Sequence, residues 1–510
     1  MSEQTPSPVV RLRAGAVRGR TEHGTSVFRG IPFAAPPVGA LRFQAPRPAP
    51  PWEGVREADV FGPPPPQAWM GPPPPGAAAG LPVRHDASDW LTVNVWTPDP
   101  GAGGLPVLVW VYGGAYRMGS AAEPGYDGSA LARSGAVVVT ANHRVGIEGY
   151  AELEGAPANR ALLDLVATLR WVQEEIAAFG GDPARVTVFG ESAGAGAIAS
   201  LLAMPAAAGL FAQAVAQSVP GTFFTPALAR DVSAELVAPL GRAPSAAALA
   251  DVPPADLLAA LAQLDRRMAT LARWGLVAHT PTPFSPVVDG EVLPRDPWTA
   301  LAAGAARDVP LVVGHNRDEW RLFLTLDGLA GRVTEEMAAE SAAVFGPGPD
   351  AGARVRAAFP EADAEERYVL ARSDRMFRVP SLHLATAHTA GGGRSHLYEL
   401  TWPAPAAGGV LGACHALDVP LVFGVLDQGL APMLLGTPPP AEAVDVSAQL
   451  QTAWTAFARD GDPGWPAHDE DRQLTRLFDV GERGGVRAYP EQASRRLWAD
   501  RPVGVLDLVG

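Results

Sequence analysis

Short apolar runs alternate along this chain with longer runs in which apolar residues recur at helical spacing. Each short run is apolar throughout, which is typical of strands buried on both faces of a parallel sheet. The longer run 160–179 is helical in pattern, and Gly180-Gly181 with the residues after it ends the predicted helix. This alternation predicts an α/β fold with a mostly parallel central sheet flanked by helices. The predicted strands are 107–112, 136–142, 186–189, 214–217, 309–313 and 396–400.

Residues from about 220 to 276 are rich in Ala and Leu and are predicted to form helices inserted between strands. In open α/β sheets, segments that follow the carboxyl ends of strands cover the ligand pocket. No Ser/Gly linker, charge run or fixed-period repeat separates the elements. We therefore expect one domain over residues 1–510, with helical insertions within about 220–390 that cap the site.

Composition and charge limit which binding partners and which cellular location we expect for this chain. The formal net charge of −14 argues against a nucleic-acid partner, which needs basic patches. The single cysteine, Cys414, excludes a disulfide within the chain. Residues 1–8 lack the basic and apolar regions of a secretory signal, and no apolar run is long enough to span a membrane. We expect a cytoplasmic protein without membrane or nucleic-acid partners, monomeric although an oligomer is left open.

The segment Gly190-Glu191-Ser192-Ala193-Gly194 carries the strongest chemical signal. A strand-like run precedes it and an Ala-rich helical run follows it, which is the setting of a nucleophile elbow. The glycines permit a turn too tight for side chains, and the turn presents the serine hydroxyl. The helix after the serine directs free N–H groups at the place where an oxyanion would form. A glycine-rich turn before an ordinary helix is the alternative interpretation.

A nucleophilic serine needs a base and a group that orients the base, in the order serine, acid, histidine for elbow-type hydrolases. Among the later histidines, His415 stands out because it lies in the loop 412–418, and catalytic groups are usually held on loops. The other histidines in the required part of the chain are His383, His388, His396 and His468.

The candidate acid is Glu319, which follows the predicted strand 309–313 through a short turn. This position places its carboxylate beyond the carboxyl end of a strand, on the same rim as Ser192. Asp318 is its chief rival, and a solvated turn is the alternative for both. The segment 109–116, a strand that runs into Gly113-Gly114, fits an oxyanion loop.

Further stretches make a family resemblance clear. They include Phe28-Arg29-Gly30-Ile31-Pro32-Phe33-Ala34, Leu91-Thr92-Val93-Asn94-Val95-Trp96, residues 179–194 and Ala216-Gln217-Ser218. The chain resembles the type-B carboxylesterases, the bacterial branch of the cholinesterase/carboxylesterase family within the α/β-hydrolases. The similarity extends from Val9 almost to the end of the sequence.

The resemblance implies an α/β-hydrolase fold and a set of site residues. It implies Ser192 as nucleophile, His415 as general base and Glu319, rather than Asp318, as the acid of the triad. The oxyanion donors that it implies are the backbone N–H groups of Gly114, Ala115 and Ala193. It also implies that Glu191 and Ser218 lie beside the triad, and that Arg144 forms a salt bridge with Asp182 in the scaffold.

The chain departs from the family pattern at a few positions. Trp320 and Ala416 stand where glycine is usual, directly after the predicted acid and base. Ser88 and Trp90 replace a glutamate and a cysteine, and the first change removes the usual acidic partner of Arg29. None of these changes removes a predicted catalytic group.

The resemblance therefore implies a serine hydrolase that cleaves small carboxylic esters through an acyl-enzyme, without cofactor or metal. An amide or carbamate hydrolase on the same triad is an alternative, because both reactions pass through a tetrahedral intermediate. A non-catalytic binding homologue is a second alternative, which the complete set of triad residues disfavours. Candidate apolar wall residues of the pocket are Phe223, Phe224, Trp274, Phe284, Met376 and Phe377.

Overall fold

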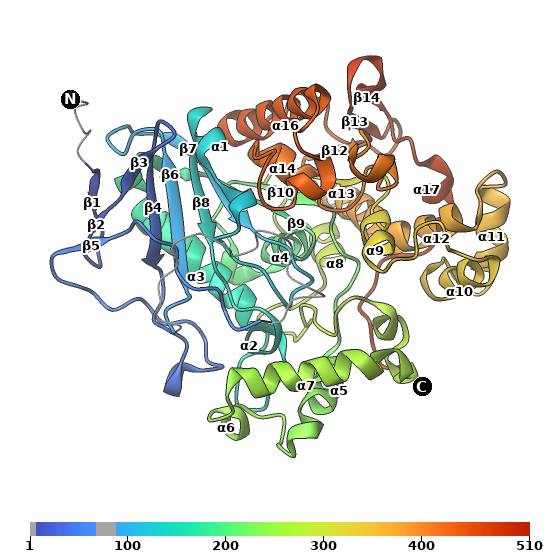
Figure 1. Cartoon of the computed structure of the whole chain (residues 1–510), viewed down its shortest axis with the longest axis horizontal. Helices are drawn as coiled ribbons and strands as arrows, with labels where there is room; N and C mark the ends of the chain where they lie inside the picture. The colour runs from blue at the N-terminus through green and yellow to red at the C-terminus, as the bar shows by residue number, and fades with distance from the viewer. Residues whose placement is uncertain (1–6, 68–87, 510) are drawn as a thin grey trace.

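The computed structural model describes residues 7–67 and 88–509, and within them the centre is an eleven-stranded sheet (Figure 1). The run of neighbours from β13 to β8 is parallel, and antiparallel pairs lie at both ends. This confirms the predicted mostly parallel sheet. The strands in spatial order are β14 (Gly485–Ala488), β13 (Leu474–Phe478), β12 (Ser395–Leu400), β11 (Leu311–Asn316), β10 (Gln213–Gln217), β9 (Gly181–Glu191), β7 (Leu105–Val111), β8 (Val137–Ala141), β6 (Thr92–Thr97), β4 (Thr25–Pro32) and β3 (Arg20–Glu22).

Side chains of β7 show how both faces of the sheet become buried. Val107 and Val109 pack on one face, against α3 (Arg160–Glu175), α4 (Ala193–Ala203) and α13 (Val379–Ala390). Leu108 and Trp110 pack on the other, against α14 (Asp418–Phe423) and α16 (Ala441–Asp460). Because successive side chains of a strand point to opposite faces, a continuous apolar run fills two cores at once.

The predicted helix 160–179 is confirmed as α3 followed by the 3-10 turn η3 (Ile176–Phe179). Gly180, at φ 85°, ends it in the left-handed region that glycine adopts without strain. All six predicted strands lie at observed strands, with boundaries that differ by a few residues.

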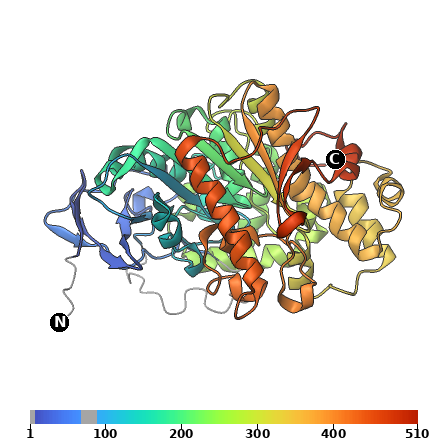
Figure 2. The same cartoon turned by 90° about the horizontal axis from the view of Figure 1, so that it is seen from above.

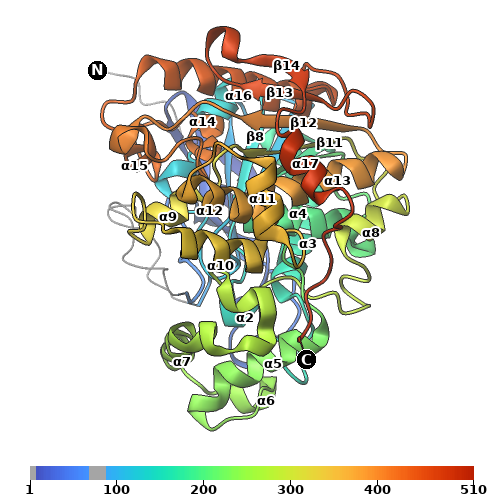
Figure 3. The same ribbon diagram turned by 90° about the vertical axis from the view of Figure 1, so that its right-hand side faces the viewer.

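Most helices within 220–390 form two groups away from the sheet, whereas α8 (Pro297–Ala302) and α13 pack in the core on one face of the sheet. In Figures 1 and 3, α5 to α7 lie together below the sheet and α9 to α12 lie at another edge. Figure 2 shows the blue N-terminal strands at the opposite end from the gold helices. The two groups are made of α5 (Pro226–Val237), α6 (Ala246–Leu249), α7 (Pro254–Arg267), α9 (Arg321–Leu326), α10 (Glu335–Phe345), α11 (Ala351–Ala358) and α12 (Ala364–Ser373), with the π-helical turn η8 (Asp374–Arg378) after them.

The remaining elements lie around these layers. A three-stranded sheet is made of β1 (Val9–Arg11), β2 (Ala16–Arg18) and β5 (Val55–Glu57). The other helices are α1 (Ser129–Arg133), α2 (Gly146–Tyr150), α15 (Ala431–Leu435) and α17 (Gln492–Trp498).

One scaffold prediction is wrong. Arg144 pairs with Asp164, not with Asp182, and both side chains of the observed pair are fully buried. The Asp164 carboxylate accepts hydrogen bonds from the backbone N, Nε and Nη2 of Arg144 at 3.0, 2.8 and 2.7 Å. The reason is the path of α3, which brings Asp164 beside the end of β8, whereas Asp182 accepts a hydrogen bond from the nearby Ala184 N–H.

Arg29 also has an acidic partner, although the usual one is replaced. Glu22, on the neighbouring strand β3, accepts hydrogen bonds from both terminal nitrogens of Arg29 at 2.8 and 2.6 Å. This contact holds the pKa of Glu22 below its ordinary value through the hydrogen bond from Arg29, against a smaller effect of burial. The antiparallel pairing of β3 with β4 thus places the Glu22 carboxylate beside Arg29. This carboxylate supplies the negative charge that was lost when Ser88 replaced the family glutamate.

Candidate active site

Ser192 stands between the end of β9 and the start of α4, with φ 56° and ψ −125°. A non-glycine residue in this region of backbone space is strained, and such strain gathers at functional sites. A Cβ atom on Gly190 would lie 2.5 Å from the Val111 carbonyl oxygen, and one on Gly194 only 2.0 Å from it. Neighbouring backbone therefore requires glycine at both positions, as the elbow pattern predicts.

Three backbone N–H groups near Ser192 have no acceptor among the described residues, and they belong to Gly114, Ala115 and Ala193. Ala193 opens α4, where the first N–H groups of a helix lack intrahelical partners. Ala115 has φ 55° and follows Gly114, at φ 110°, in the turn after β7. The turn and the helix start thus present unpaired donors beside the serine, which is what an oxyanion needs.

His415 and Glu319 are in direct contact. Nδ1 of His415 lies 2.6 Å from Oε2 of Glu319, whose side chain is fully buried. The other carboxylate oxygen, Oε1, accepts hydrogen bonds from Ser218 Oγ at 2.6 Å and from the Asn316 N–H at 2.9 Å. Because these groups donate to the Glu319 carboxylate, the carboxylate acts as an acceptor, and His415 donates to it through Nδ1–H. The second ring nitrogen, Nε2, is then available to accept or give a proton.

The rival acid, Asp318, lies apart from the histidine. Its Oδ2 atom accepts the Ala413 N–H at 3.0 Å, and its Oδ1 atom lies 3.8 Å from Nε of Arg321. Asp318 therefore holds the backbone of the histidine loop, while Glu319 alone of the two contacts the imidazole.

Nε2 of His415 faces Glu191 in this structure. It lies 3.0 Å from Glu191 Oε1, and within the described part of the chain the Ser192 Oγ atom makes no hydrogen bond. A Cβ on Gly113 would stand 2.9 Å from Glu191 Oε2 and 3.1 Å from Ser192 Cβ, so the carboxylate and the serine border the same point. The structure thus joins Glu319 to His415, and leaves Ser192 beside them without a bond to the imidazole.

Charge in this pocket shifts two pKa values upward. Burial acts against the protonated form of His415, but the charges of Glu191 and Glu319 outweigh it and raise the pKa of His415 to about 9. Burial, followed by the charges of Asp418 and Glu319, raises the pKa of Glu191 to about 8, against the opposing charge of His415. Each value depends on the charge of the other group, so the pair titrates together rather than as two independent sites.

Asp418 is a residue that the sequence reasoning missed. It is fully buried, and it accepts hydrogen bonds from Gln217 Nε2 at 2.8 Å and from the Tyr398 hydroxyl at 3.0 Å. Asn316 donates to the Cys414 carbonyl at 2.8 Å and so holds the same loop. The signal in the sequence is an acidic residue three positions after His415, directly before an apolar run.

A pocket opens beside Ser192. Four of the six predicted wall residues line it: Phe224, Phe284, Met376 and Phe377. The other two were wrong, because Phe223 packs in the core against Trp298 and Trp274 donates to Asp231. The remaining lining residues are Ala115, Tyr116, Ala193, Pro220, Thr222, Thr280, Pro281, Thr282 and Phe323.

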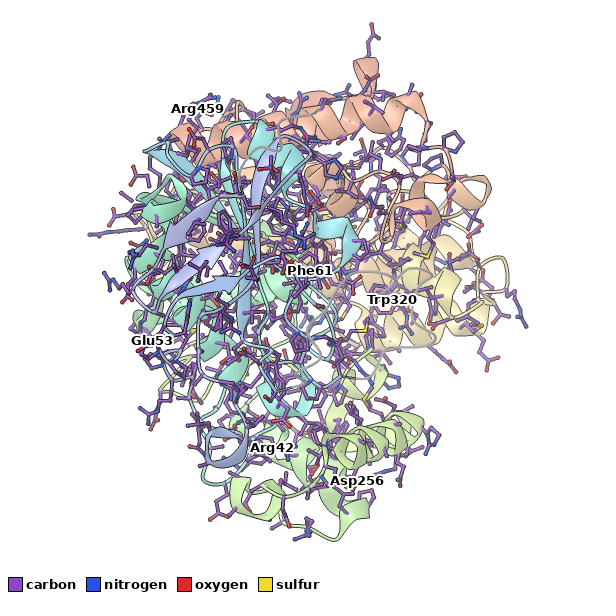
Figure 4. The ribbon with its side chains drawn as sticks, turned by 60° about the vertical axis from the view of Figure 1, so that its left-hand side comes forward. Arg42, Glu53, Phe61, Asp256, Trp320 and Arg459 are labelled. Atoms are coloured by element: carbon purple, nitrogen blue, oxygen red, sulfur yellow. The ribbon has the colours of Figure 1, made fainter. Side chains whose placement is uncertain are left out.

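Trp320, which stands in place of a family glycine, packs among the helices α9, α10 and α12 (Figure 4). Its ring lies 4.6 Å from that of Phe323, and its backbone N–H donates to Ser373 Oγ at 3.0 Å. Phe323 in turn lies parallel to Phe377, whose ring centroid is 4.3 Å from that of His415. The ring of Trp320 therefore packs among helices and meets the imidazole through Phe323, whose ring centroid also lies 5.2 Å from that of His415.

Within residues 7–67 and 88–509, no group of three or more His, Cys, Asp or Glu side chains is placed to hold a metal ion. Over the same residues, the helices are all too short or too polar to cross a bilayer.

Comparison with known proteins agrees with this geometry. Residues 6–478 match the Carboxylesterase family. The chain belongs to the carboxylesterase family. It is 37% identical to para-nitrobenzyl esterase of Bacillus subtilis (strain 168), over 92% of this chain and 94% of that protein. It is 34% identical to fumonisin B1 esterase of Sphingopyxis macrogoltabida, over 97% of this chain and 91% of that protein.

Solved structures of carboxylesterases have the same architecture. A thermophilic PNB esterase superposes with a TM-score of 0.84 at 35% identity, over 96% of this chain and 100% of that one. The carboxylesterase EST55 of Geobacillus stearothermophilus gives a TM-score of 0.81 at 34% identity, over 96% and 99%. The protein is therefore a carboxylesterase with the α/β-hydrolase fold, which hydrolyses carboxylic esters, as the sequence predicted.

Proposed function

We propose that Ser192, His415 and Glu319 form the catalytic triad of this carboxylesterase, and that Gly114, Ala115 and Ala193 supply its oxyanion hole. The observation that carries the proposal is the 2.6 Å contact between His415 Nδ1 and Glu319 Oε2, formed beside the strained elbow serine. Such contacts orient a base toward its nucleophile. Glu191 and Ser218 are positioning residues in this proposal, because each touches one member of the His415–Glu319 pair.

In the proposed first step, Ser192 Oγ attacks the ester carbonyl carbon and His415 Nε2 takes the hydroxyl proton. Glu319 stabilises the imidazolium that forms, through the hydrogen bond at Nδ1. Negative charge develops on the carbonyl oxygen, where the free N–H groups of Gly114, Ala115 and Ala193 receive it. Each such donor is worth about 2.7–4 kcal/mol in the barrier.

The second half of the reaction repeats the same proton path. His415 gives its proton to the alcohol oxygen, the C–O bond breaks, and an acyl group remains on Ser192. Water then attacks the acyl carbon as His415 accepts its proton, and the acid leaves as the serine recovers its hydrogen.

For the first step, Nε2, which lies 3.0 Å from Glu191 Oε1 without hydrogen-bond geometry, must form a hydrogen bond with Ser192. The two residues are consecutive, and catalytic hydrogen bonds often form fully only when substrate is bound. The imidazole is held at Nδ1 by Glu319, so a turn of the ring about that bond is the change that we propose.

The proposed substrates are small-molecule esters whose acyl group fits the apolar pocket beside Ser192. An amide or carbamate would use the same triad, and a comparison of kcat/KM on matched ester and amide substrates distinguishes these reactions. We propose further that residues 1–510 act as one catalytic unit, with the helices within about 220–390 as its cap. Monomeric state and cytoplasmic location stay predictions.

Replacing the nucleophile tests the proposal. Ser192→Ala should abolish turnover of p-nitrophenyl acetate and p-nitrophenyl butyrate, and should prevent labelling by a fluorophosphonate that mass mapping places on Ser192. Ser200→Ala is the matched control, because Ser200 lies in the same helix and only donates to the Gly196 carbonyl. Substantial turnover by folded Ser192→Ala would refute the assignment.

A further inference from the structure

The segment after β10 forms one wall of the pocket. Pro220, Thr222 and Phe224 line the pocket, while Phe223 between them packs into the core on the other side. This alternation is that of extended chain, in which every second side chain points to the same face. The width of the pocket at this wall therefore depends on how the backbone of residues 220–225 is held.

Distant parts of the chain hold that backbone through its carbonyl groups. Ser285 Oγ donates to the Thr222 carbonyl at 2.5 Å, and the Val288 N–H donates to the Phe224 carbonyl at 2.9 Å. The Phe223 carbonyl between them accepts the N–H of Leu506 at 2.7 Å. Two supports thus come from residues 285–288, and the third comes from the C-terminal segment.

Further hydrogen bonds anchor the C-terminal segment 503–509 on both sides of the bond between the Leu506 N–H and the Phe223 carbonyl. The Thr225 N–H donates to the Leu506 carbonyl at 2.9 Å, and Thr225 Oγ1 donates to Asp507 Oδ1 at 2.6 Å. The Val509 N–H donates to the Arg273 carbonyl at 2.8 Å. Figures 1 and 3 show the red segment descending from α17 to the green helices α5 and α7.

This segment also separates the wall from solvent. Phe224 pairs with Leu506 on one side and with Val287 on the other, as the middle of three extended segments. Phe224 is only 2% exposed, whereas Asp507, Leu508 and Val509 outside it are exposed. Leu506 packs against the apolar cluster that contains Phe224, Phe284 and Ala193.

We propose that segment 503–509 is a specificity-determining support, which limits the size of the acyl group that the pocket accepts. The proposal rests on the proposed function, since it takes the pocket beside Ser192 as the acyl site. The acyl group stays bonded to Ser192 after the alcohol leaves, so it must fit within these walls throughout the reaction. Without the segment, residues 223–225 lose three backbone and side-chain bonds and Phe224 gains room to move outward.

The experiment compares ester substrates of different acyl length in two variants of the protein. The first variant ends at Gly504. The second is Leu506→Pro, which lacks the backbone N–H that donates to the Phe223 carbonyl. Leu508→Ala is the matched control, because its side chain is exposed and lies two residues further along. For each protein, kcat/KM is measured on p-nitrophenyl acetate and p-nitrophenyl octanoate, and folding is followed by circular dichroism. We expect the octanoate-to-acetate ratio to rise about tenfold in both variants and to stay unchanged in the control, since pocket fit to a few methylenes discriminates by such factors.

The outcomes separate the two hypotheses. An octanoate-to-acetate ratio that is unchanged or lower in the folded variants, or loss of both activities in them, overturns the role of the segment. If the intact enzyme neither hydrolyses p-nitrophenyl acetate nor is labelled at Ser192 by a fluorophosphonate, the proposed function itself fails. The proline variant keeps the test decisive if the truncated chain does not fold.

Discussion

Oε1 of Glu191 lies 3.0 Å from Nε2 of His415, the nitrogen that the proposed mechanism needs for Ser192. Both side chains are buried, and the contact lies at the end of the imidazole opposite Glu319. The proposed base therefore stands between two carboxylates, with Asp418 as a third acid nearby. Glu191 has two opposing effects in this arrangement, because it competes with Ser192 for Nε2 and raises the basicity of the imidazole.

The first prediction concerns pH. The general base acts as neutral imidazole, so kcat/KM rises as pH passes the pKa of His415. The negative charge of Glu191 raises that pKa, and Glu191→Gln removes the charge at nearly constant shape. We expect the acidic limb of the kcat/KM profile for p-nitrophenyl butyrate to move to lower pH by about 1 unit, the usual effect of removing one adjacent charge.

Glu53→Gln serves as the control for this measurement, because Glu53 is an exposed carboxylate in the N-terminal region (Figure 4). Its pH profile should coincide with that of the unaltered enzyme. A limb that stays in place or moves to higher pH in Glu191→Gln would show that Glu191 does not set the basicity of His415.

The second prediction separates the two adjacent acids. Glu319→Gln keeps the size of the side chain but loses the charge that stabilises the imidazolium, so kcat should fall about 10⁴-fold, as for the equivalent change in a serine-protease triad. Asp318→Asn should lower kcat less than about tenfold, because Asp318 only braces Ala413 and Arg321. Steady-state kinetics on p-nitrophenyl acetate measure both, and equal losses in the two variants would contradict the assignment of Glu319.

The parts of this structure that the sequence predicts are those where local pattern and three-dimensional position coincide. The strands around β9 are apolar throughout because both of their faces are buried, and so their pattern is unmistakable. Gly190 and Gly194 are required by the approach of the Val111 carbonyl, so the elbow is visible as a motif. Loop position and chain order made His415 and the pair Asp318-Glu319 candidates, and the family resemblance selected Glu319.

The features that the sequence does not predict are contacts between side chains that lie far apart in the sequence. The predicted partner of Arg144, Asp182, was wrong. The distance between helix α3 and the end of strand β8 decides that Asp164 forms the pair. The family resemblance placed Glu191 beside the triad, but its contact with Nε2 of His415 is set only when the sheet and the histidine loop are placed. Phe323 lines the pocket because Trp320 and Phe377 stack against it, which no periodicity records.

The third prediction concerns Trp320, a buried ring in contact with Phe323 and Arg372. Trp320→Ala leaves a cavity among α9, α10 and α12, so the free energy of unfolding should fall by about 3–5 kcal/mol. Because Phe323 loses the ring that supports it beside the pocket, kcat/KM should fall as well. Urea denaturation measures the first effect, with Leu326→Ala as the control, because Leu326 is exposed in α9, the helix that begins directly after Trp320. Equal stability of the two variants would contradict this account of the tryptophan.

The last prediction compares the two aspartates considered for Arg144. Asp164→Asn leaves a fully buried guanidinium without its charge partner, and removal of one member of a buried ion pair costs about 3–5 kcal/mol of unfolding free energy. Asp182 accepts a backbone N–H at the partly exposed start of β9, so Asp182→Asn should cost at most about 1 kcal/mol. Urea denaturation of both variants decides between them, and a larger loss at Asp182 would place the pair where the family resemblance put it. Because Arg144 also donates to the Gln44 carbonyl at 2.7 Å, the variant at Asp164 should in addition loosen the segment around Gln44, which hydrogen exchange of that segment would report.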